Sequence, residues 1–128
     1  MTDRARDQAR AQLDGIMELV AQARDAIETG NEDSIESALD DIHLTPLSRE
    51  VRSGWTAPGY PLEALEYCIL LCTGGPAVRI LGTLNQYAEP TLATLEYQDW
   101  GTPWTEYVLT PAETDGIMEY ARAFYFGT

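Results

Sequence analysis

The chain has 128 residues, which suits one domain with a single core, and no apolar run approaches the roughly 20 residues that span a bilayer. It carries 21 acidic residues against 8 basic ones, all of them arginine, for a formal net charge of −13. A charge of this sign repels nucleic acid and anionic membranes, so it argues against direct binding of either and favours a protein partner with a basic surface. Acidity that serves only solubility is the alternative.

The first seven residues mix acids and arginines and lack the apolar core of a secretory signal, so we expect a cytoplasmic protein of a bacterial host cell. Cys68 and Cys72 are the only cysteines. Four residues apart on a strand, they would share one face at a separation of roughly 13 Å. That distance excludes a disulfide and shared metal ligation, so we predict reduced thiols, no metal site and no cofactor.

Two helices are predicted in the first third of the chain. The first runs from about Asp3 to Thr29, and its apolar residues recur at spacings of three and four: Ala9, Leu13, Ile16, Val20, Ala23 and Ile27. Gly30 ends it, and Asn31 is placed to cap the second helix, from Glu32 to about His43. The second helix is expected to face inward with Ile35, Ala38, Leu39 and Ile42.

The remainder predicts a sheet followed by one helix. Strands are expected at 48–55, 65–73, 78–85 and 91–100, with a short fifth at 104–109, and the short links favour an antiparallel meander. Thr110-Pro111-Ala112-Glu113 is a capping box that begins a helix expected to reach Phe126. We therefore predict one α+β domain, residues 1–128. It comprises a helical hairpin (1–45), then a four- to five-stranded antiparallel sheet with the C-terminal helix packed on it (46–128).

Three segments carry a resemblance: LCTGGPAVRI (71–80), YQDWGTPWTEY (97–107) and YARAFYFG (120–127). In these the chain resembles an uncharacterised family of small acidic proteins of phages and bacterial mobile elements, over roughly residues 46–127. The family supplies no catalytic residues. The resemblance implies a context in which small acidic proteins inhibit host defence, as anti-CRISPR and anti-restriction proteins do.

The first candidate site is the acidic second helix. Glu32, Glu36 and Asp40 follow one another at intervals of four, so their carboxylates form a row with steps of about 6 Å, and Asp33 and Asp41 flank it. Such a row can imitate a nucleic-acid backbone in front of a groove rich in arginine and lysine. The alternative is a solvated face, with Glu32 and Asp33 present because acids are favoured at a helix N-terminus.

The second candidate site is the segment 98–107. Trp100 and Trp104 would serve as contact anchors, and Asp99 and Glu106 would bind arginines of a partner. In the alternative interpretation both indole rings cap the core and Asp99 caps the turn.

Catalysis is not indicated. His43 is the single histidine, at the end of an acidic helix, and no serine or cysteine has an evident base. Gly74-Gly75 with Arg79 lacks the spacing of a phosphate loop and predicts a hairpin turn. We therefore expect a protein that is not an enzyme.

The preferred interpretation is a mobile-element protein that binds and inhibits a basic, nucleic-acid-binding surface of a host defence complex. One rival is a small-molecule-binding regulatory domain with a pocket lined by Trp55, Trp104 and Tyr107; a second is a structural or assembly protein. A deep aromatic pocket would favour the regulatory domain. A contiguous negative patch would favour the inhibitor, and a large exposed apolar face would favour the assembly protein.

Overall fold

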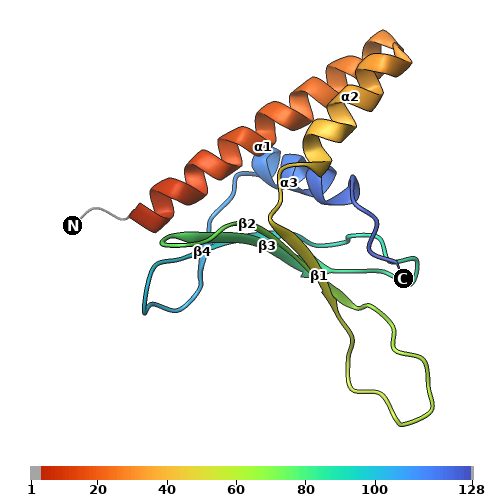
Figure 1. Ribbon diagram of the computed structural model, residues 1–128, viewed down its shortest axis with the longest axis vertical. Helices are drawn as coiled ribbons and strands as arrows, with labels where there is room; N and C mark the ends of the chain where they lie inside the picture. The colour runs from red at the N-terminus through yellow and green to blue at the C-terminus, as the bar shows by residue number, and fades with distance from the viewer. Residues whose placement is uncertain (1–3, 128) are drawn as a thin grey trace.

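The computed structural model describes residues 4–127, which form a layer of helices on one face of an antiparallel sheet (Figure 1). The predicted α+β class is confirmed. The elements are α1 Arg4–Thr29, α2 Glu32–His43, β1 Ser48–Arg52, β2 Glu66–Cys72, β3 Ala77–Thr83, β4 Thr94–Gln98, β5 Thr105–Tyr107 and α3 Pro111–Arg122. The sheet order is β1-β2-β3-β4-β5, the meander that the short links predict, and the fifth strand is present. The predicted start of the first helix, Asp3, lies outside the described residues.

The sheet has one covered face and one open face. Side chains alternate along β2 and β3, and Tyr67, Ile69, Val78 and Ile80 point toward the helices, where each is at most 1% exposed. Leu95 of β4 joins them and is fully buried. No helix of residues 4–127 lies over the opposite face of the sheet (Figure 1), so their helical side chains enter the core from one side.

The apolar stripe of α1 is confirmed over its first two thirds and wrong at its end. Ala9, Leu13, Ile16 and Val20 are buried, and Ala23 is half-buried, whereas Ile27 is 64% exposed. A helix of 26 residues is about 39 Å long, and four strand spacings cover only about 19 Å. The last turns of α1 therefore extend beyond the sheet, where no strand lies beneath Ile27.

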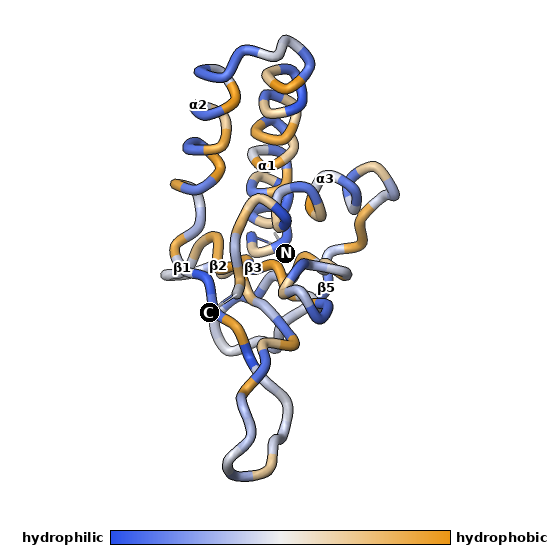
Figure 2. The backbone as a smooth tube through the Cα atoms, turned by 90° about the vertical axis from the view of Figure 1, so that its right-hand side faces the viewer, coloured by the Kyte–Doolittle hydropathy of each residue, from blue (hydrophilic) through white to orange (hydrophobic). Residues whose placement is uncertain are grey.

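α2 folds back along this overhanging end of α1 and rises with it away from the sheet (Figures 1 and 2). The Asn31 side chain accepts a hydrogen bond from the Ser34 amide, which caps the helix as predicted. Ala38 and Ile42 are buried, but Ile35 is only half-buried and Leu39 is 37% exposed, against expectation. Only one side of α2 is covered, mainly by α1, and the chain at the end of α3 contacts its last residue, His43.

α3 returns to the centre of the molecule and packs against α1 and the sheet. Its capping box is complete: Glu113 N–H donates to the Thr110 hydroxyl, and Thr110 N–H donates to the Glu113 carboxylate. Ile117 and Tyr120 are fully buried. The helix ends at Arg122, four residues earlier than predicted, and the chain then turns so that the Phe126 ring lies 4.8 Å from that of Tyr67.

A β-bulge in β2 corrects the expectation for the cysteines. Leu70 pairs with Arg79, but Cys72 pairs with Val78, so the pairing slips by one residue between them. Arg79 points to the open face and Val78 to the core, and paired residues share a face. Cys68 therefore lies on the open face and Cys72 on the helix side, where it contacts Gln8 of α1.

Candidate functional site

The α2 carboxylates form a continuous acidic surface on the overhanging end of the molecule. All five are exposed: Glu32, Asp33, Glu36, Asp40 and Asp41. Helical periodicity places Glu32, Glu36 and Asp40 in one row, and Asp33 and Asp41 in the neighbouring row. In Figure 2 the hydrophilic side of α2 faces away from α1. We call these five side chains the α2 acidic surface.

No arginine neutralises this surface within residues 4–127. The ion pairs of this part of the chain join Arg10 to Asp14 and Glu113, Arg24 to Glu119, Arg52 to Glu66, and Arg79 to Glu96. Arg24 belongs to the helix that α2 packs on, yet it pairs with α3 at 2.6 Å. Within the described residues, arginine therefore pairs with acids of α1, α3 and the sheet, and with none of the five carboxylates of α2.

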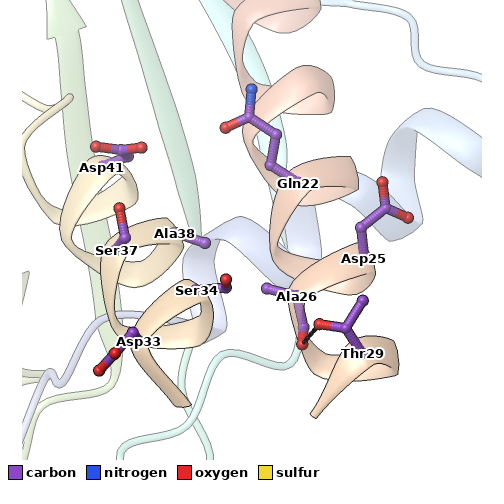
Figure 3. Close-up of a pocket in the computed structure, with 9 residues that line it drawn as sticks. All are labelled: Gln22, Asp25, Ala26, Thr29, Asp33, Ser34, Ser37, Ala38 and Asp41. Carbon is purple, nitrogen blue, oxygen red and sulfur yellow. Dashed lines mark hydrogen bonds between the residues drawn. The ribbon is translucent and has the colours of Figure 1, made fainter. Parts of the chain in front are cut away.

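A shallow groove of about 520 Å³ between α1 and α2 extends the α2 acidic surface (Figure 3). Ala26 and Ala38 point toward one another where the helices meet, and the carboxylates of Asp25 and Asp41 stand on either side. Its complete lining is Gln22, Asp25, Ala26, Thr29, Asp33, Ser34, Ser37, Ala38 and Asp41. Three carboxylates, three hydroxyls and one side-chain amide provide acceptors for guanidinium or ammonium groups. Sequence reasoning missed Asp25 because its place depends on the packing of two helices.

The segment 98–107 forms the β4–β5 connection and agrees only in part with the alternative interpretation. Asp99 does cap the turn: its carboxylate accepts from the Trp100 amide at 2.8 Å, and its amide donates to the Thr102 hydroxyl. Trp100, however, is 80% exposed rather than buried over the core. It is available as a contact anchor.

Trp104 lies on the open face of the sheet, where its ring stacks on Arg79 with the guanidinium carbon 3.9 Å from the ring centre. The same Arg79 donates from Nε to Glu96 at 2.9 Å. Glu106 is exposed on this face and directly opposite Glu96 in the pairing of β4 with β5. Arg79 of β3 therefore links Glu96 of β4 and Trp104, which precedes β5, on the open face.

The two candidate sites do not form one surface. α2 rises on the helix side above the β1 edge, and the β4–β5 connection lies at the opposite edge of the sheet, as both views show (Figures 1 and 2). A single partner that contacts both would have to reach around the molecule.

The pocket expected from Trp55, Trp104 and Tyr107 does not form. Trp55 is fully exposed in the β1–β2 loop, and Trp104 is on the open face. Tyr107 is on the other side of the sheet, 8% exposed, in contact with Arg6 and Arg10 of α1. These three rings are dispersed over both faces because the β1–β2 loop extends away from the sheet and strand alternation separates Trp104 from Tyr107.

His43 and the cysteines have structural contacts. His43 Nε2 lies 2.7 Å from the Ala123 carbonyl, and its ring contacts Phe124 with centroids 5.4 Å apart, which ties the end of α2 to the end of α3. Burial raises the pKa of both Cys68 and Cys72, so neither thiol is activated. Residues 4–127 contain no cluster of three histidine, cysteine or acidic side chains arranged to hold a metal ion.

Comparison with known proteins returned no match to a family model, to a curated protein or to a solved structure. Among the described residues, none of the helices has the length and apolarity required to cross a bilayer.

Proposed function

We propose that this protein binds a basic, nucleic-acid-binding surface of a host protein through the α2 acidic surface, and that it acts in this way as an inhibitor of host defence encoded by a mobile element. The observation that carries the proposal is the concentration of five exposed carboxylates on one helix of 12 residues, none of which pairs with an arginine within residues 4–127. The resemblance of residues 46–127 to small acidic proteins of phages supplies the biological context.

The α2 acidic surface has the geometry of a nucleic-acid mimic. Its carboxylates stand on a rigid helix at steps of about 6 Å along a row, comparable to the spacing of phosphates along a strand, and a second row runs beside the first. A groove that neutralises phosphates with arginine and lysine would be attracted to such a surface, and counterion release would contribute to binding. Steering by the negative field would raise the association rate.

Helix stability alone does not account for these acids. Glu32 and Asp33 lie in the first turn, where the helix dipole favours them. Asp40 and Asp41 lie near the C-terminus, where the dipole disfavours negative charge. The row of Glu32, Glu36 and Asp40 also places like charges four residues apart, which costs a few tenths of a kcal/mol per pair. Acids kept at unfavourable positions are typical of a binding surface, and a cationic partner would relieve their repulsion.

The test compares two triple variants that each remove three negative charges. Glu32→Gln/Glu36→Gln/Asp40→Asn removes the main row of the α2 acidic surface, and Asp7→Asn/Glu18→Gln/Glu63→Gln removes exposed acids elsewhere. Each protein is immobilised and incubated with bacterial lysate, and bound proteins are eluted with duplex DNA or with salt.

We expect the wild type and the control variant to retain the same nucleic-acid-binding protein and to release it to duplex DNA. The α2 variant should bind that protein at least tenfold more weakly, mainly through slower association, and wild-type binding should weaken as salt screens the charges. Unchanged binding by the folded α2 variant, or an equal loss in the control variant, would reject the proposal.

A further inference from the structure

The open face of the sheet is not a uniformly polar surface. Cys68, Leu70 and Leu81 point outward from β2 and β3 and are half-buried, although none of the helices in the described part of the chain covers them. Cys68 pairs directly with Leu81, and Leu70 pairs with Arg79, so these side chains are contiguous. An outward face that only met solvent would carry polar residues at its centre. A concavity of about 440 Å³ lies here, with Leu81 and Cys68 on its floor and Arg52, Glu66 and Arg79 around them.

Two loops flank this face and carry exposed tryptophans. The β1–β2 loop (53–65) and the β4–β5 connection (99–104) both leave the sheet on the side away from the helices, from opposite edges (Figure 1). Trp55 is 107% exposed in the first, and Trp100 is 80% exposed in the second. Trp104 stacks on Arg79 between them. All three tryptophans of the chain are therefore on this side, and tryptophan is the residue most enriched among binding hot spots.

The charges of the open face call for a cationic occupant. Arg52 and Arg79 are already paired with Glu66 and Glu96 within the face. Glu106 stands directly opposite Glu96 across the strand pair, an arrangement that is unfavourable for like charges. Glu50 likewise points to this face and has no ion pair within residues 4–127. Four acids against two arginines leave the face negative, and a net charge of −13 opposes a second copy of the chain.

We propose that the open face of the sheet, between the two tryptophan-bearing loops, is a second docking surface that receives a basic amphipathic helix of a partner protein. Four strand spacings leave about 19 Å between the edge strands, and this is the distance that a helix lying across the strands must span. About 13 residues would span this width. The apolar side of the helix covers Leu70 and Leu81, its lysines or arginines reach Glu50 and Glu106, and Trp55 and Trp100 close on its ends. This surface is independent of the α2 acidic surface.

The probe is a fluorescein-labelled peptide of 14 residues in which leucine and lysine alternate at helical spacing. A lysine–serine peptide of the same charge and a leucine–glutamate peptide serve as controls. Binding is measured by fluorescence anisotropy to the wild type, to Trp55→Ala/Trp100→Ala, to Glu106→Gln and to the α2 triple variant. The exposed tryptophans can be removed without loss of core contacts, and circular dichroism melting verifies that each variant folds.

We expect the leucine–lysine peptide to bind at least tenfold more tightly than either control peptide. Its Kd should rise at least tenfold in the tryptophan pair variant and about threefold in Glu106→Gln, and change less than twofold in the α2 triple variant.

Three results would overturn the proposal. The first is equal binding of the lysine–serine peptide, which would indicate charge alone. The second is a loss of binding in the α2 triple variant with no change in the tryptophan pair variant, which would move the site to α2. The third is a dimer of the protein alone that dissociates in the tryptophan pair variant, which would make a second copy the occupant. Failure here leaves the proposed function standing, since that rests on the α2 variant.

Discussion

α2 and α3 have the same length, 12 residues, and both are acidic, yet they hold opposite positions in the molecule. α3 buries Ile117 and Tyr120 completely, and two of its carboxylates, Glu113 and Glu119, bind arginines of α1. α2 is buried on only one side, and its five carboxylates bind no arginine within residues 4–127. Acidic residues thus have two environments in these helices: in α3, Glu113 and Glu119 fasten the helix to α1, whereas in α2 all five carboxylates are exposed to solvent.

Removing α3 is the most severe test of this comparison. Deletion of residues 111–128 removes Ile117, Tyr120, Phe124 and Phe126 from the core, so we expect cooperative unfolding to be lost altogether. Differential scanning calorimetry measures this directly. A truncated chain that still melts sharply near the wild-type temperature would show that α3 is peripheral.

Truncation of one side chain in each helix measures how much α3 and α2 contribute to stability. Ile117→Ala creates a cavity in a fully buried site of α3 and should lower the free energy of unfolding by about 2–4 kcal/mol. Leu39→Ala on α2 removes a side chain that is 37% exposed, so its cost should stay below about 1 kcal/mol. Urea unfolding of the two variants gives both values, and equal losses would contradict the distinction between the helices.

The ionisation of Glu113 in α3 should make the free energy of unfolding depend on pH. Its carboxylate accepts the Thr110 amide and an Arg10 guanidinium at 2.7 Å, and these hydrogen bonds hold its pKa below the ordinary value of 4.5. A lowered folded-state pKa stabilises the protein above the ordinary pKa, and that stabilisation is lost as pH falls through the folded-state pKa. Glu113→Gln should therefore cost about 0.3–1 kcal/mol at pH 7.

The difference between the wild type and Glu113→Gln should shrink steadily below about pH 4.5. Urea unfolding at a series of pH values measures it. A difference that stayed constant down to pH 2 would show that the charge of Glu113 contributes nothing to stability.

The smallest effects should have opposite signs in the two helices. Glu119→Gln removes the negative charge opposite Arg24 and one of the two oxygens that accept its hydrogen bonds, so its melting temperature should fall slightly. Glu36→Gln removes repulsion from Glu32 and Asp40, so its melting temperature should rise slightly. Both shifts should shrink in high salt. Shifts of the same sign would mean that the acids of α2 and α3 do not differ in environment.

Periodicity and capping signals predicted most of the fold. The bounds of α2 and the capping box of α3 were correct to the residue, because local hydrogen bonds set them. The exposure of Ile27 was not predictable, because the apolar pattern of a helix does not encode the width of the sheet beneath it. Cys72 was misplaced for a similar reason: the bulge depends on how β2 and β3 are paired, and a strand pattern read alone assumes no slip.

In the candidate sites, too, local spacing was predictable from the sequence and tertiary contacts were not. The rows of α2 carboxylates follow from helical spacing alone, and their exposure agrees with the prediction. Their lack of arginine partners depends on tertiary contacts. The position of Arg24 in the sequence does not decide between α2 and α3 as its partner, and in the structure it pairs with Glu119 of α3. Asp25 and the open face with its tryptophans required the packed structure, because they bring together segments distant along the chain.

Because the tryptophan and tyrosine rings lie in different regions, they are separate spectroscopic probes of unfolding. Every tryptophan lies on the open side of the sheet, in a loop, a turn or a stack on Arg79, while Tyr67 and Tyr120 are in the core between sheet and helices. Tryptophan fluorescence therefore reports changes in the loops and on the open face, and it responds little to changes in the helix layer. The change in tyrosine absorbance on unfolding comes mainly from the buried rings of Tyr67, Tyr107 and Tyr120, because Tyr60, Tyr87 and Tyr125 are already exposed in the folded protein. Separate unfolding curves from the two chromophores would reveal whether the open face loosens before the core does.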